Sequence, residues 1–306
     1  MRTAAFSSVL FSLLFCSQNV LATMRSTASD DLRAMTFNVR FPNPDDGSNR
    51  WSLRAPIFIE TIRRAAPDII GTQEIFSNQA HDLITALPMY HWFGVDRFGE
   101  HRDEHMGIFY RTDRLQLIRQ GTFWLSQKPH EAGSMSWGEA LPRYVNWGVF
   151  KTKTQHPYQF LLLDTHLANR DDEDRTARLE STRLILQYLA HLPADLPIIL
   201  TADLNSGEAD NPHQLLATVL TDARVTAKKV SGPVGTFHDF TGRPQARIDF
   251  IMTRGFVASA VRTDDFHRGN HYPSDHFPVA AVLHRMTTTE FASGAAHSDQ
   301  PKGVKR

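Results

Sequence analysis

The sequence predicts an α/β fold in which two mixed β-sheets pack face to face with helices on the outside. Strand-like and helical segments alternate along most of the chain, which favours an α/β architecture. Residues 106–122 and 144–164, however, each have the pattern of a hairpin-like strand pair, so a purely parallel sheet is not expected. With 306 residues and 41% hydrophobic content, the chain can bury one large core. We expect a single domain over residues 32–285.

The N-terminal half should provide two helices and most of the strands. Residues 32–39 indicate a first buried strand, and residues 53–66 fit a helix that Pro67 stops. A short strand over 68–71 leads to Glu74. A second helix fits residues 77–87, with Ser77 as N-cap and Pro88 just beyond the end. Further strands are predicted at 90–95, 106–110, 115–122, 144–151 and 159–164.

The C-terminal half should provide a long helix and the last strands. The helix is expected from residue 171 to about 191, with the acidic run 171–174 in its first turn, where it complements the helix dipole. The same acids could form a metal site, but a solvated helix start is the simpler interpretation. A strand over 196–200 leads to Asp203. After a short helix and a loop, the last strands are predicted at 247–252, 257–263 and 279–283.

The first 22 residues have the features of a secretory signal peptide. Arg2 precedes an apolar stretch over residues 9–15, and a small-residue cleavage site ends at Ala22. We therefore expect an exported protein, periplasmic or secreted, whose mature chain begins near Thr23. A membrane anchor is the alternative, but the apolar stretch is too short to span a bilayer, so no stable membrane insertion is expected.

The two ends of the chain and its cysteine content lead to further expectations. Residues 23–31 should form a polar lead-in, and residues 286–306 a disordered tail. Cys16 is the only cysteine and leaves with the signal peptide, so the mature protein has no disulfide and no thiolate zinc ligand. Acylation of Cys16 is a minor alternative because bulky Phe15 precedes it.

Charge argues against one class of function. Without residues 1–22 the chain has 32 basic and 33 acidic side chains, a net charge of −1. A protein that binds nucleic acid tightly and independently of sequence normally has a basic field. The charge balance therefore weakens a pure nuclease interpretation.

Short polar motifs lie at or just beyond the ends of the predicted strands. They are Thr36-Phe-Asn-Val39, Thr72-Gln-Glu74, Asp164-Thr-His-Leu167, Ala202-Asp-Leu-Asn205, Arg247-Ile-Asp-Phe-Ile251 and Tyr272-Pro-Ser-Asp-His-Phe-Pro-Val279. Open α/β sheets gather functional groups at one edge, so the polar side chains of these motifs should converge there. Each motif alone is weak evidence, because Asp and Asn favour strand-end turns in any case. Their ordered succession carries the inference.

The residue types in these motifs favour metal-dependent chemistry on phosphate esters. The carboxylates and amides form an oxygen-rich set that suits a hard cation, Mg²⁺ or Mn²⁺, namely Glu74, Asp203, Asp249, Asp275, Asn38 and Asn205. Zinc would require several histidines or thiolates. A hard cation would withdraw charge from a phosphate oxygen while a carboxylate orients a water for in-line attack.

The ordered motifs resemble the endonuclease/exonuclease/phosphatase superfamily over residues 32–285. Its members include pancreatic-type deoxyribonuclease, abasic-site endonucleases, inositol polyphosphate 5-phosphatases, bacterial neutral sphingomyelinases and polyadenylate deadenylases. The resemblance implies a four-layered α/β/β/α sandwich with a divalent-metal site. The segments 43–47, 121–126, 140–143 and 235–237 resemble a largely uncharacterised bacterial branch more closely.

The resemblance also implies roles for the motif residues that concern the metal ion and the attacking water. Glu74 would be the main metal ligand, with Asp275 and Asn38 completing or positioning the metal shell. Asp203 would align or deprotonate the water, and Asn205 would hydrogen-bond the phosphate.

The two motif histidines take the remaining roles that the resemblance implies. His276 would contact the phosphate or act as the acid–base partner, with its tautomer fixed by Asp249. His166 would assist the leaving oxygen.

Two positions depart from the family pattern. The usual Gly-Asp-Phe-Asn is Ala202-Asp-Leu-Asn205, which keeps both polar side chains. The branch usually has Asp-His after its Thr-His-Leu, where this chain has Ala168-Asn169. Asn169 is therefore a candidate substitute in substrate binding. Arg143 is a second candidate, as a guanidinium clamp on phosphate, although a surface salt bridge explains it equally well.

The segment 101–105 contains a pattern that we reject as a catalytic site. His101-Arg-Asp-Glu-His105 matches the His-x-x-Glu-His pattern of some zinc proteases, which requires a helix to place both histidines on one face. Gly99 and Gly107 bracket the segment between two predicted strands. We expect a solvated loop that borders the substrate cleft at most.

The sequence as a whole predicts an exported, metal-dependent phosphodiesterase that acts on nucleic acid or on a small or lipid-linked phosphodiester. The alternative is a phosphomonoesterase acting on sugar or inositol phosphates. A third hypothesis, a non-catalytic binding protein on the same scaffold, conflicts with the complete set of motif residues. No protein partner is implied, and a monomer is expected.

Overall fold

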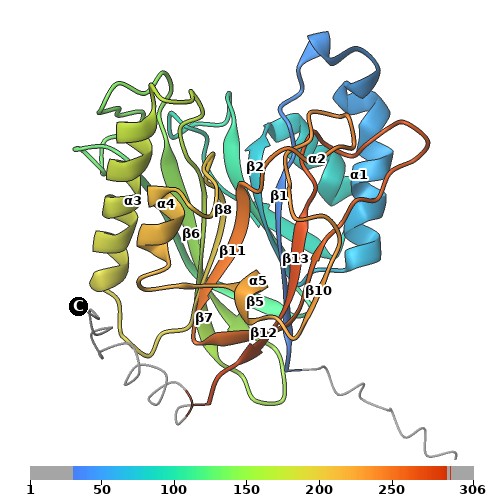
Figure 1. Ribbon diagram of the computed structural model, residues 1–306. Coiled ribbons are helices and arrows are strands. Elements are labelled where there is room, and N and C mark those ends of the chain that lie inside the picture. The colour runs from blue at the N-terminus through green and yellow to red at the C-terminus, as the bar shows by residue number, and fades with distance from the viewer. Residues whose placement is uncertain (1–29, 288–289, 291–306) are drawn as a thin grey trace, which may run out of the picture.

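The computed structural model describes residues 30–287 and Glu290, and it consists of two β-sheets packed face to face with helices on both outer faces (Figure 1). The predicted signal peptide over 1–22, most of the polar lead-in and nearly all of the predicted tail lie outside the described residues. No helix in the described part of the chain has the length and apolar character needed to cross a bilayer.

The first sheet has seven strands, and its central strands carry part of the site. In spatial order they are β10 (Lys229–Ser231), β12 (Phe256–Thr263), β13 (Val279–Arg285), β1 (Leu32–Asn38), β2 (Ile69–Ile75), β4 (His105–Arg111) and β3 (Tyr90–Phe93). Strands β1 and β2 are parallel, whereas β13 runs antiparallel to β1. The sheet is therefore mixed.

The second sheet has six strands and is also mixed. In spatial order they are β5 (Leu115–Trp124), β6 (Tyr144–Thr152), β7 (Gln159–His166), β8 (Ile198–Asp203), β11 (Asp249–Arg254) and β9 (Thr221–Asp222). Strands β7 and β8 are parallel, and the other neighbours are antiparallel.

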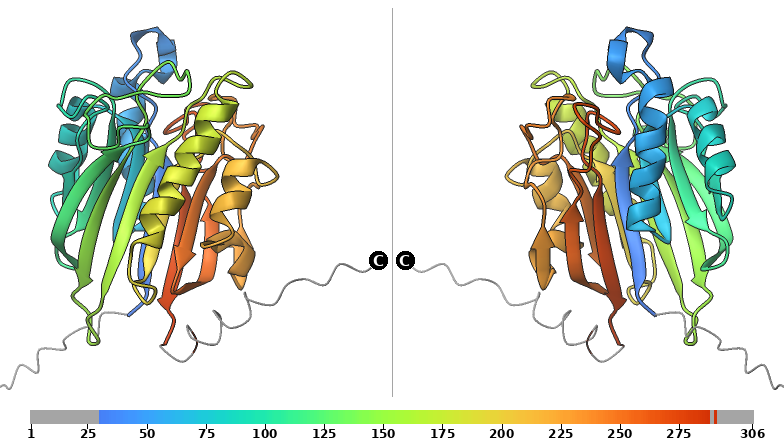
Figure 2. Two further views of the ribbon diagram at one scale, coloured as in Figure 1. Left: turned by 90° about the vertical axis from the view of Figure 1, so that its left-hand side faces the viewer. Right: turned by 90° about the vertical axis from the view of Figure 1, so that its right-hand side faces the viewer.

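Helices complete the four layers. α1 (Trp51–Ala65) and α2 (Ser77–Ala86) cover the outer face of the first sheet, and α3 (Arg175–Ala190) and α4 (Asn211–Leu216) cover that of the second (Figure 2). The short elements η1 (Pro44–Asn49) and α5 (Ala223–Thr226) lie in connections. The predicted α/β/β/α sandwich is confirmed.

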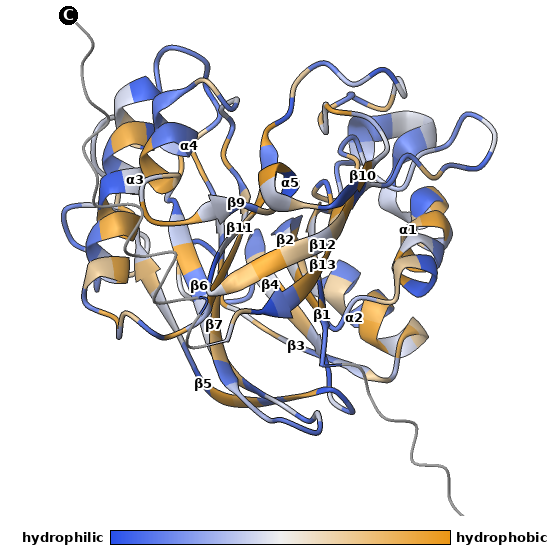
Figure 3. Ribbon diagram, turned by 60° about the horizontal axis from the view of Figure 1, so that its bottom comes forward, coloured by the Kyte–Doolittle hydropathy of each residue, from blue (hydrophilic) through white to orange (hydrophobic). Residues whose placement is uncertain are grey.

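Three large apolar cores hold the layers together in the described part of the chain. The central core lies between the sheets and includes Ile108 from the first and Phe150 from the second. The outer cores use the apolar faces of the helices, for example Phe58 of α1 against the first sheet and Ile185 of α3 against the second. Figure 3 shows this segregation, with the hydrophobic colour on the strands and on parts of the helices. Burial of this surface is the main favourable term in folding.

One detail of the predicted topology is wrong. The 106–122 segment is not a hairpin, because β4 belongs to the first sheet and β5 to the second. The short connection crosses between the sheets, so that Ile108 and Leu115 enter the same central core from opposite sides. The 144–164 hairpin is confirmed by the antiparallel pairing of β6 and β7.

The acidic run 171–174 precedes helix α3 instead of forming its first turn. The helix begins at Arg175, and Asp174 occupies the N-cap position. The Asp174 carboxylate accepts hydrogen bonds from the backbone N–H and the side chain of Arg170, at 2.8 and 3.2 Å. The acids therefore stabilise a turn, since local side-chain contacts compete with helix extension.

A polar contact joins the two sheets just below the functional edge. The Asp164 carboxylate on β7 accepts a 2.7 Å hydrogen bond from Gln73 Nε2 on β2 and another, also 2.7 Å, from Thr201 Oγ1 on β8. Burial raises the pKa of Asp164 well above its usual range, which favours the neutral acid. Gly71 on β2 lies directly against this group.

We predict that Gly71→Ala strongly destabilises the protein. The added Cβ would overlap Thr201 Oγ1 and Asp164 Oδ1, and neither packed sheet can shift easily. Overpacking of this kind costs about 1–3 kcal/mol. Calorimetry should show a lower Tm, whereas the matched Gly207→Ala variant, whose Cβ has only Asp210 Oδ2 in reach at 3.5 Å, should keep its Tm. Equal Tm values for the two variants would contradict the close approach of the sheets.

Candidate active site

Strand direction brings the motif residues to one edge of the sandwich. The parallel strands β1 and β2 both run toward this edge, where they place Asn38 and Glu74. The parallel strands β7 and β8 place His166 opposite Asp203 at the equivalent edge of the second sheet. Antiparallel β11 begins where β8 ends, and its first residue, Asp249, pairs with Asp203. All these ends lie at the top of the view in Figure 1.

A cavity of about 500 Å³ opens at this edge. Seven of the predicted site residues line it, namely Glu74, His166, Asn169, Asp203, Asn205, Asp275 and His276. The other three predicted residues, Asn38, Asp249 and Arg143, are not in the cavity wall, and each hydrogen-bonds a residue that is. The structure therefore brings the predicted set together, while the role of each residue stays a prediction.

Asn38 links the carboxylates of the two sheets. Its Nδ2 donates to Glu74 Oε1 on the first sheet and to Asp203 Oδ2 on the second, both at 3.0 Å. Its own Oδ1 accepts from the backbone N–H of Arg40 at 2.9 Å. Asn38 therefore positions the two carboxylates relative to each other.

Glu74 projects from an irregular point in its strand. Its φ of 61° is left-handed, and the pairing of β2 with β4 shifts register between Thr72 and Ile75, as at a β-bulge. Its Oε2 accepts from the Phe41 backbone N–H at 3.1 Å. A strained backbone conformation of this kind persists where the surrounding structure holds it in place. Here it directs the Glu74 carboxylate into the cavity.

Asp275 contributes a second carboxylate in the same wall. Ser274 Oγ donates to its Oδ1 at 3.1 Å, and Arg40 Nε lies 3.7 Å from its Oδ2. Burial raises the pKa of Asp275, and the charge of nearby Glu74 raises it further, although His276 and Arg40 oppose this. Two carboxylates are thus crowded together in a poorly hydrated place.

Asp203, Asp249 and His276 form a buried acid–base cluster. His276 Nδ1 lies 2.9 Å from Asp249 Oδ2 and 3.8 Å from Asp203 Oδ2. Burial alone would lower the pKa of His276, but the charge and hydrogen bond of Asp249 outweigh it and raise this pKa well above its usual range. The arrangement favours an imidazolium held in a fixed orientation.

His166 has a partner that the sequence analysis missed. Its Nδ1 lies 3.4 Å from Glu104 Oε1, and its Nε2 lies 3.6 Å from Asp203 Oδ2. Burial alone would raise the pKa of Glu104, but the hydrogen bond with His166 and the charge of Arg97 lower it to about 2. Glu104 therefore orients His166 as a charged carboxylate.

The expectation of a solvated loop over residues 101–105 is corrected in part. The segment is not helical, so the protease pattern is rejected as expected, but Glu104 and His105 are buried. The sequence signal for the burial of Glu104 was its position directly before a strand with an apolar run. This signal was obscured because Arg102 and its neighbours are charged and typical of an exposed loop.

Arg143 and Asn169 act together. Arg143 is buried, and its Nη2 donates to Asn169 Oδ1 at 3.2 Å, while Nη1 lies 4.0 Å from Glu104 Oε1. Asn169 is exposed at the cavity. Of the two earlier interpretations, the surface salt bridge does not fit a buried side chain. The geometry instead places Asn169 between Arg143 and the cavity.

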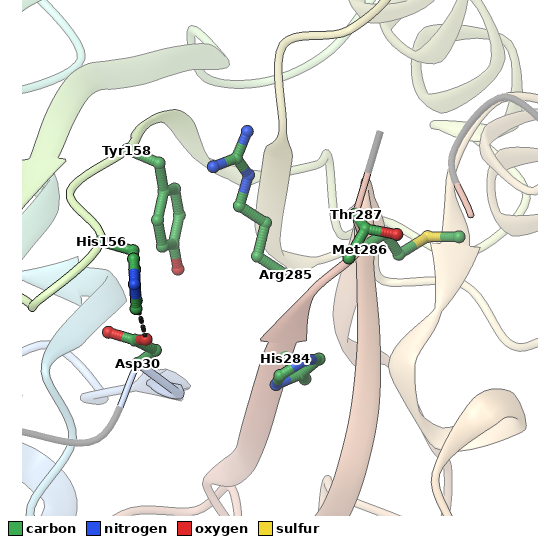
Figure 4. Close-up of a pocket in the computed structure, with 7 residues that line it drawn as sticks. All are labelled: Asp30, His156, Tyr158, His284, Arg285, Met286 and Thr287. Atoms are coloured by element: carbon green, nitrogen blue, oxygen red, sulfur yellow. Dashed lines mark hydrogen bonds and ion pairs between the residues drawn. The ribbon is translucent and has the colours of Figure 1, made fainter. Parts of the chain in front are cut away.

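A second cavity, of about 330 Å³, lies at the opposite end of the strands (Figure 4). It is bordered by the beginning of the described chain and by the end of β13, and His156 Nδ1 pairs there with Asp30 Oδ2 at 2.9 Å. None of the motif residues faces it. The chemistry predicted from the motifs therefore belongs to the first cavity.

Comparison with known proteins decides the family. The model of the Endonuclease/Exonuclease/phosphatase family matches residues 35–276. The chain belongs to the endonuclease/exonuclease/phosphatase family. Its members are metal-dependent hydrolases, and they include phosphodiesterases and phosphatases. No curated protein matches the chain.

Solved structures of the family share the fold. A family protein from Bacteroides vulgatus is 32% identical, with a TM-score of 0.78 over 83% of this chain and 99% of that one. A mannosyl-6-phosphatase from Bacteroides thetaiotaomicron is also 32% identical, with a TM-score of 0.75 over 82% and 99%. The human nocturnin catalytic domain, at 19% identity and a TM-score of 0.66, shows the fold alone.

The cavity has the chemistry that the divalent metal of this family requires. Glu74 and Asp275 offer oxygen ligands, and their crowded charges lack a full counter-charge in the wall. Nearby Asp203, Asp249 and His276 each place one ligand atom within 4.8 Å of the others, which a metal ion could also bridge. Because Asp249 already holds His276 Nδ1, the Glu74–Asp275 pair fits a cation better. Oxygen donors of this kind suit Mg²⁺ or Mn²⁺.

We predict that Asp249→Asn lowers kcat/KM by about 10²–10⁴-fold. Without the carboxylate charge, burial should lower the pKa of His276, so the imidazolium is lost at a lower pH. The high-pH limb of the rate profile should therefore move to lower pH.

The same substitution should change the pH dependence of stability. In the native enzyme the raised pKa of His276 stabilises the fold below about pH 6.5, and this contribution is lost as the pH rises through the folded-state pKa. In the variant that dependence should shrink, as urea titrations at several pH values can show. A variant with the native rate profile would remove Asp249 from the mechanism.

Proposed function

We propose that the protein is a Mg²⁺- or Mn²⁺-dependent phosphoric ester hydrolase whose substrate is a small phosphate monoester of the sugar phosphate class. The observation that carries this proposal is one cavity in which the oxygen-rich pair Glu74 and Asp275 faces Asp203 and two oriented histidines. That arrangement suits direct attack of water on phosphorus, and no nucleophilic side chain is required.

In this proposal, different side chains of the cavity act on the attacking water and on the phosphate. Asp203 holds an attacking water and receives its proton, since its carboxylate is fixed by Asn38 Nδ2 and by the Asn205 backbone N–H at 3.0 Å each. His276, charged and oriented by Asp249, donates to a non-bridging phosphate oxygen as negative charge grows there. Charge-assisted hydrogen bonds of this kind are the strong ones.

The leaving group departs on the side of His166. Glu104 holds His166 Nδ1, so that Nε2, which lies 3.6 Å from Asp203 Oδ2, is the ring atom that faces the ester oxygen and supplies a proton. Asn205 lines the same wall, with a φ of 44° and its Nδ2 fixed on Leu167 O at 2.9 Å. Glu74 and Asp275 would hold a divalent cation, which would supply Lewis-acid stabilisation of the phosphate and of the leaving oxygen.

Three observations favour a small monoester over the phosphodiester that the sequence ranked first. A 32% identical structure, covered over 99% of its length, is named as a mannosyl-6-phosphatase. The cavity wall carries further carboxylates, Asp171, Asp210 and Asp239, which repel a polyanion and can accept sugar hydroxyls. The chain has no basic excess. A small phosphodiester remains the second candidate because the family includes phosphodiesterases.

We predict that the purified protein hydrolyses mannose 6-phosphate and p-nitrophenyl phosphate with Mg²⁺ or Mn²⁺, and bis-p-nitrophenyl phosphate much more slowly. EDTA should abolish turnover, and excess Mg²⁺ should restore it. His276→Ala should lower the rate by at least about 10²-fold, which shows that the activity belongs to this cavity. Turnover confined to the diester would replace the proposal with the second candidate, and activity that survives EDTA would refute metal dependence.

We also propose that the protein is exported through the N-terminal segment 1–22. Expression of the full chain in a bacterial host should yield a periplasmic or secreted product, and Edman sequencing should find its first residue near Thr23. Replacement of the apolar residues Leu13 and Leu14 by Arg should retain the uncleaved chain in the cytoplasm. A cytoplasmic product that still begins at Met1 in the unaltered protein would contradict export.

A further inference from the structure

Arg40 occupies an unusual place in the cavity wall. It follows Asn38 by two residues, in a left-handed conformation with a φ of 61°. The Asp46 carboxylate on η1 accepts two hydrogen bonds from the Arg40 guanidinium, from Nε at 3.1 Å and from Nη2 at 2.9 Å. The guanidinium also lies 4.5 Å from the Phe41 ring centroid. A side chain with these contacts is held ready, so little conformational entropy is lost when it binds a ligand.

Arg40 is also the guanidinium of this wall that can reach a ligand. The other arginine lining the cavity, Arg178, directs its donors at the backbone oxygens of Ala168, Arg170 and Asp171. In contrast, Arg40 Nη1 has no acceptor among the described residues, and the Arg40 side chain remains 25% exposed. Its Nε is 3.7 Å from Asp275 Oδ2, which is beyond hydrogen-bond distance.

The position of Arg40 beside Glu74 and Asp275 places a fixed positive charge where a phosphate must bind. A phosphate monoester carries close to two negative charges at neutral pH, whereas a diester carries one. A planar guanidinium gains more from a doubly charged oxygen cluster than from a singly charged one. We propose that Arg40, held by Asp46, is the residue that makes this cavity prefer phosphate dianions over monoanions.

This inference rests on the proposed phosphoric ester hydrolase but concerns its selectivity. A purely structural Arg40 would only neutralise Asp275, and its loss would weaken every ligand alike. A selectivity residue, in contrast, changes the ratio of two affinities. That ratio is the quantity to measure.

The test uses a matched pair of ligands that the enzyme cannot hydrolyse. Phenylphosphonate is a dianion above its second ionisation, and methyl(phenyl)phosphinate is a monoanion of nearly the same shape with no ester bond. Calorimetric titration of each into the protein with Mg²⁺ gives two Kd values without any turnover. The native protein should bind the dianion at least 10-fold more tightly, since each charge-assisted hydrogen bond contributes roughly that factor.

Arg40→Met should weaken binding of the dianion by roughly 10- to 100-fold and binding of the monoanion by less than about threefold. Arg40→Lys keeps the charge but loses the fork that grips Asp46, so it should give an intermediate ratio. Asp46→Asn leaves the guanidinium in place and loosens it, and should also reduce the ratio. Arg268→Met is the control, because it removes an exposed arginine paired with Glu60 and should leave both Kd values unchanged.

Two outcomes would overturn the inference. One is an equal loss for both ligands in Arg40→Met, and the other is a native protein that binds both ligands equally. A protein that turns over only diesters would refute the proposed monoesterase, yet the ratio of the two Kd values would still report on Arg40. The two failures are therefore distinguishable.

Discussion

The site depends on the distance between the two sheets. Glu74 comes from the first sheet, while His166 and Asp203 come from the second, so their separation follows from how the sheets pack. Two contacts fix it. Asn38 Nδ2 bridges Glu74 on β2 and Asp203 on β8 behind the cavity wall, and the buried Gln73–Asp164 hydrogen bond joins β2 to β7 one layer deeper. Buried polar contacts are directional, which apolar packing is not, and so they specify one spacing.

Burying the charged side chains of this site costs free energy, and contacts in the surrounding fold offset that cost. Arg54 is fully buried and donates to the backbone oxygens of Val39, Arg40, Asn49 and Pro273. Burial lowers its pKa to about 10, although nearby acids, Asp275 first among them, oppose this. One guanidinium thus ties the loop that carries Arg40 to the loop that carries Asp275. Both loops are thereby attached to helix α1, which supplies Arg54.

The features that could be predicted from the sequence are those that strand order determines. Residues that follow parallel strands must meet at one edge, so Asn38, Glu74, His166 and Asp203 could be placed together before any coordinates. The crossing from β4 to β5 could not be foreseen, because a short turn between two amphipathic strands fits a hairpin and a change of sheet equally well. Glu104 was missed for a related reason. Its burial is created by Arg143 and His166, which are distant in sequence, together with the nearer Arg97.

The departure from the family pattern at Ala168-Asn169 can be understood from these contacts. The loop after β7 keeps its shape through Arg178, which binds Ala168 O and Arg170 O through its guanidinium, so a change of side chain at 168 or 169 does not disturb it. Asn169 instead takes Arg143 as its partner, and Arg143 lies beside the Glu104 that orients His166. A ligand that displaces the Asn169 amide would free a buried guanidinium near Glu104, the partner of His166. Substrate recognition and the acid proposed for the leaving group are therefore linked through one short chain of side chains, and the same chain reaches Glu74 through Asp203 and Asn38.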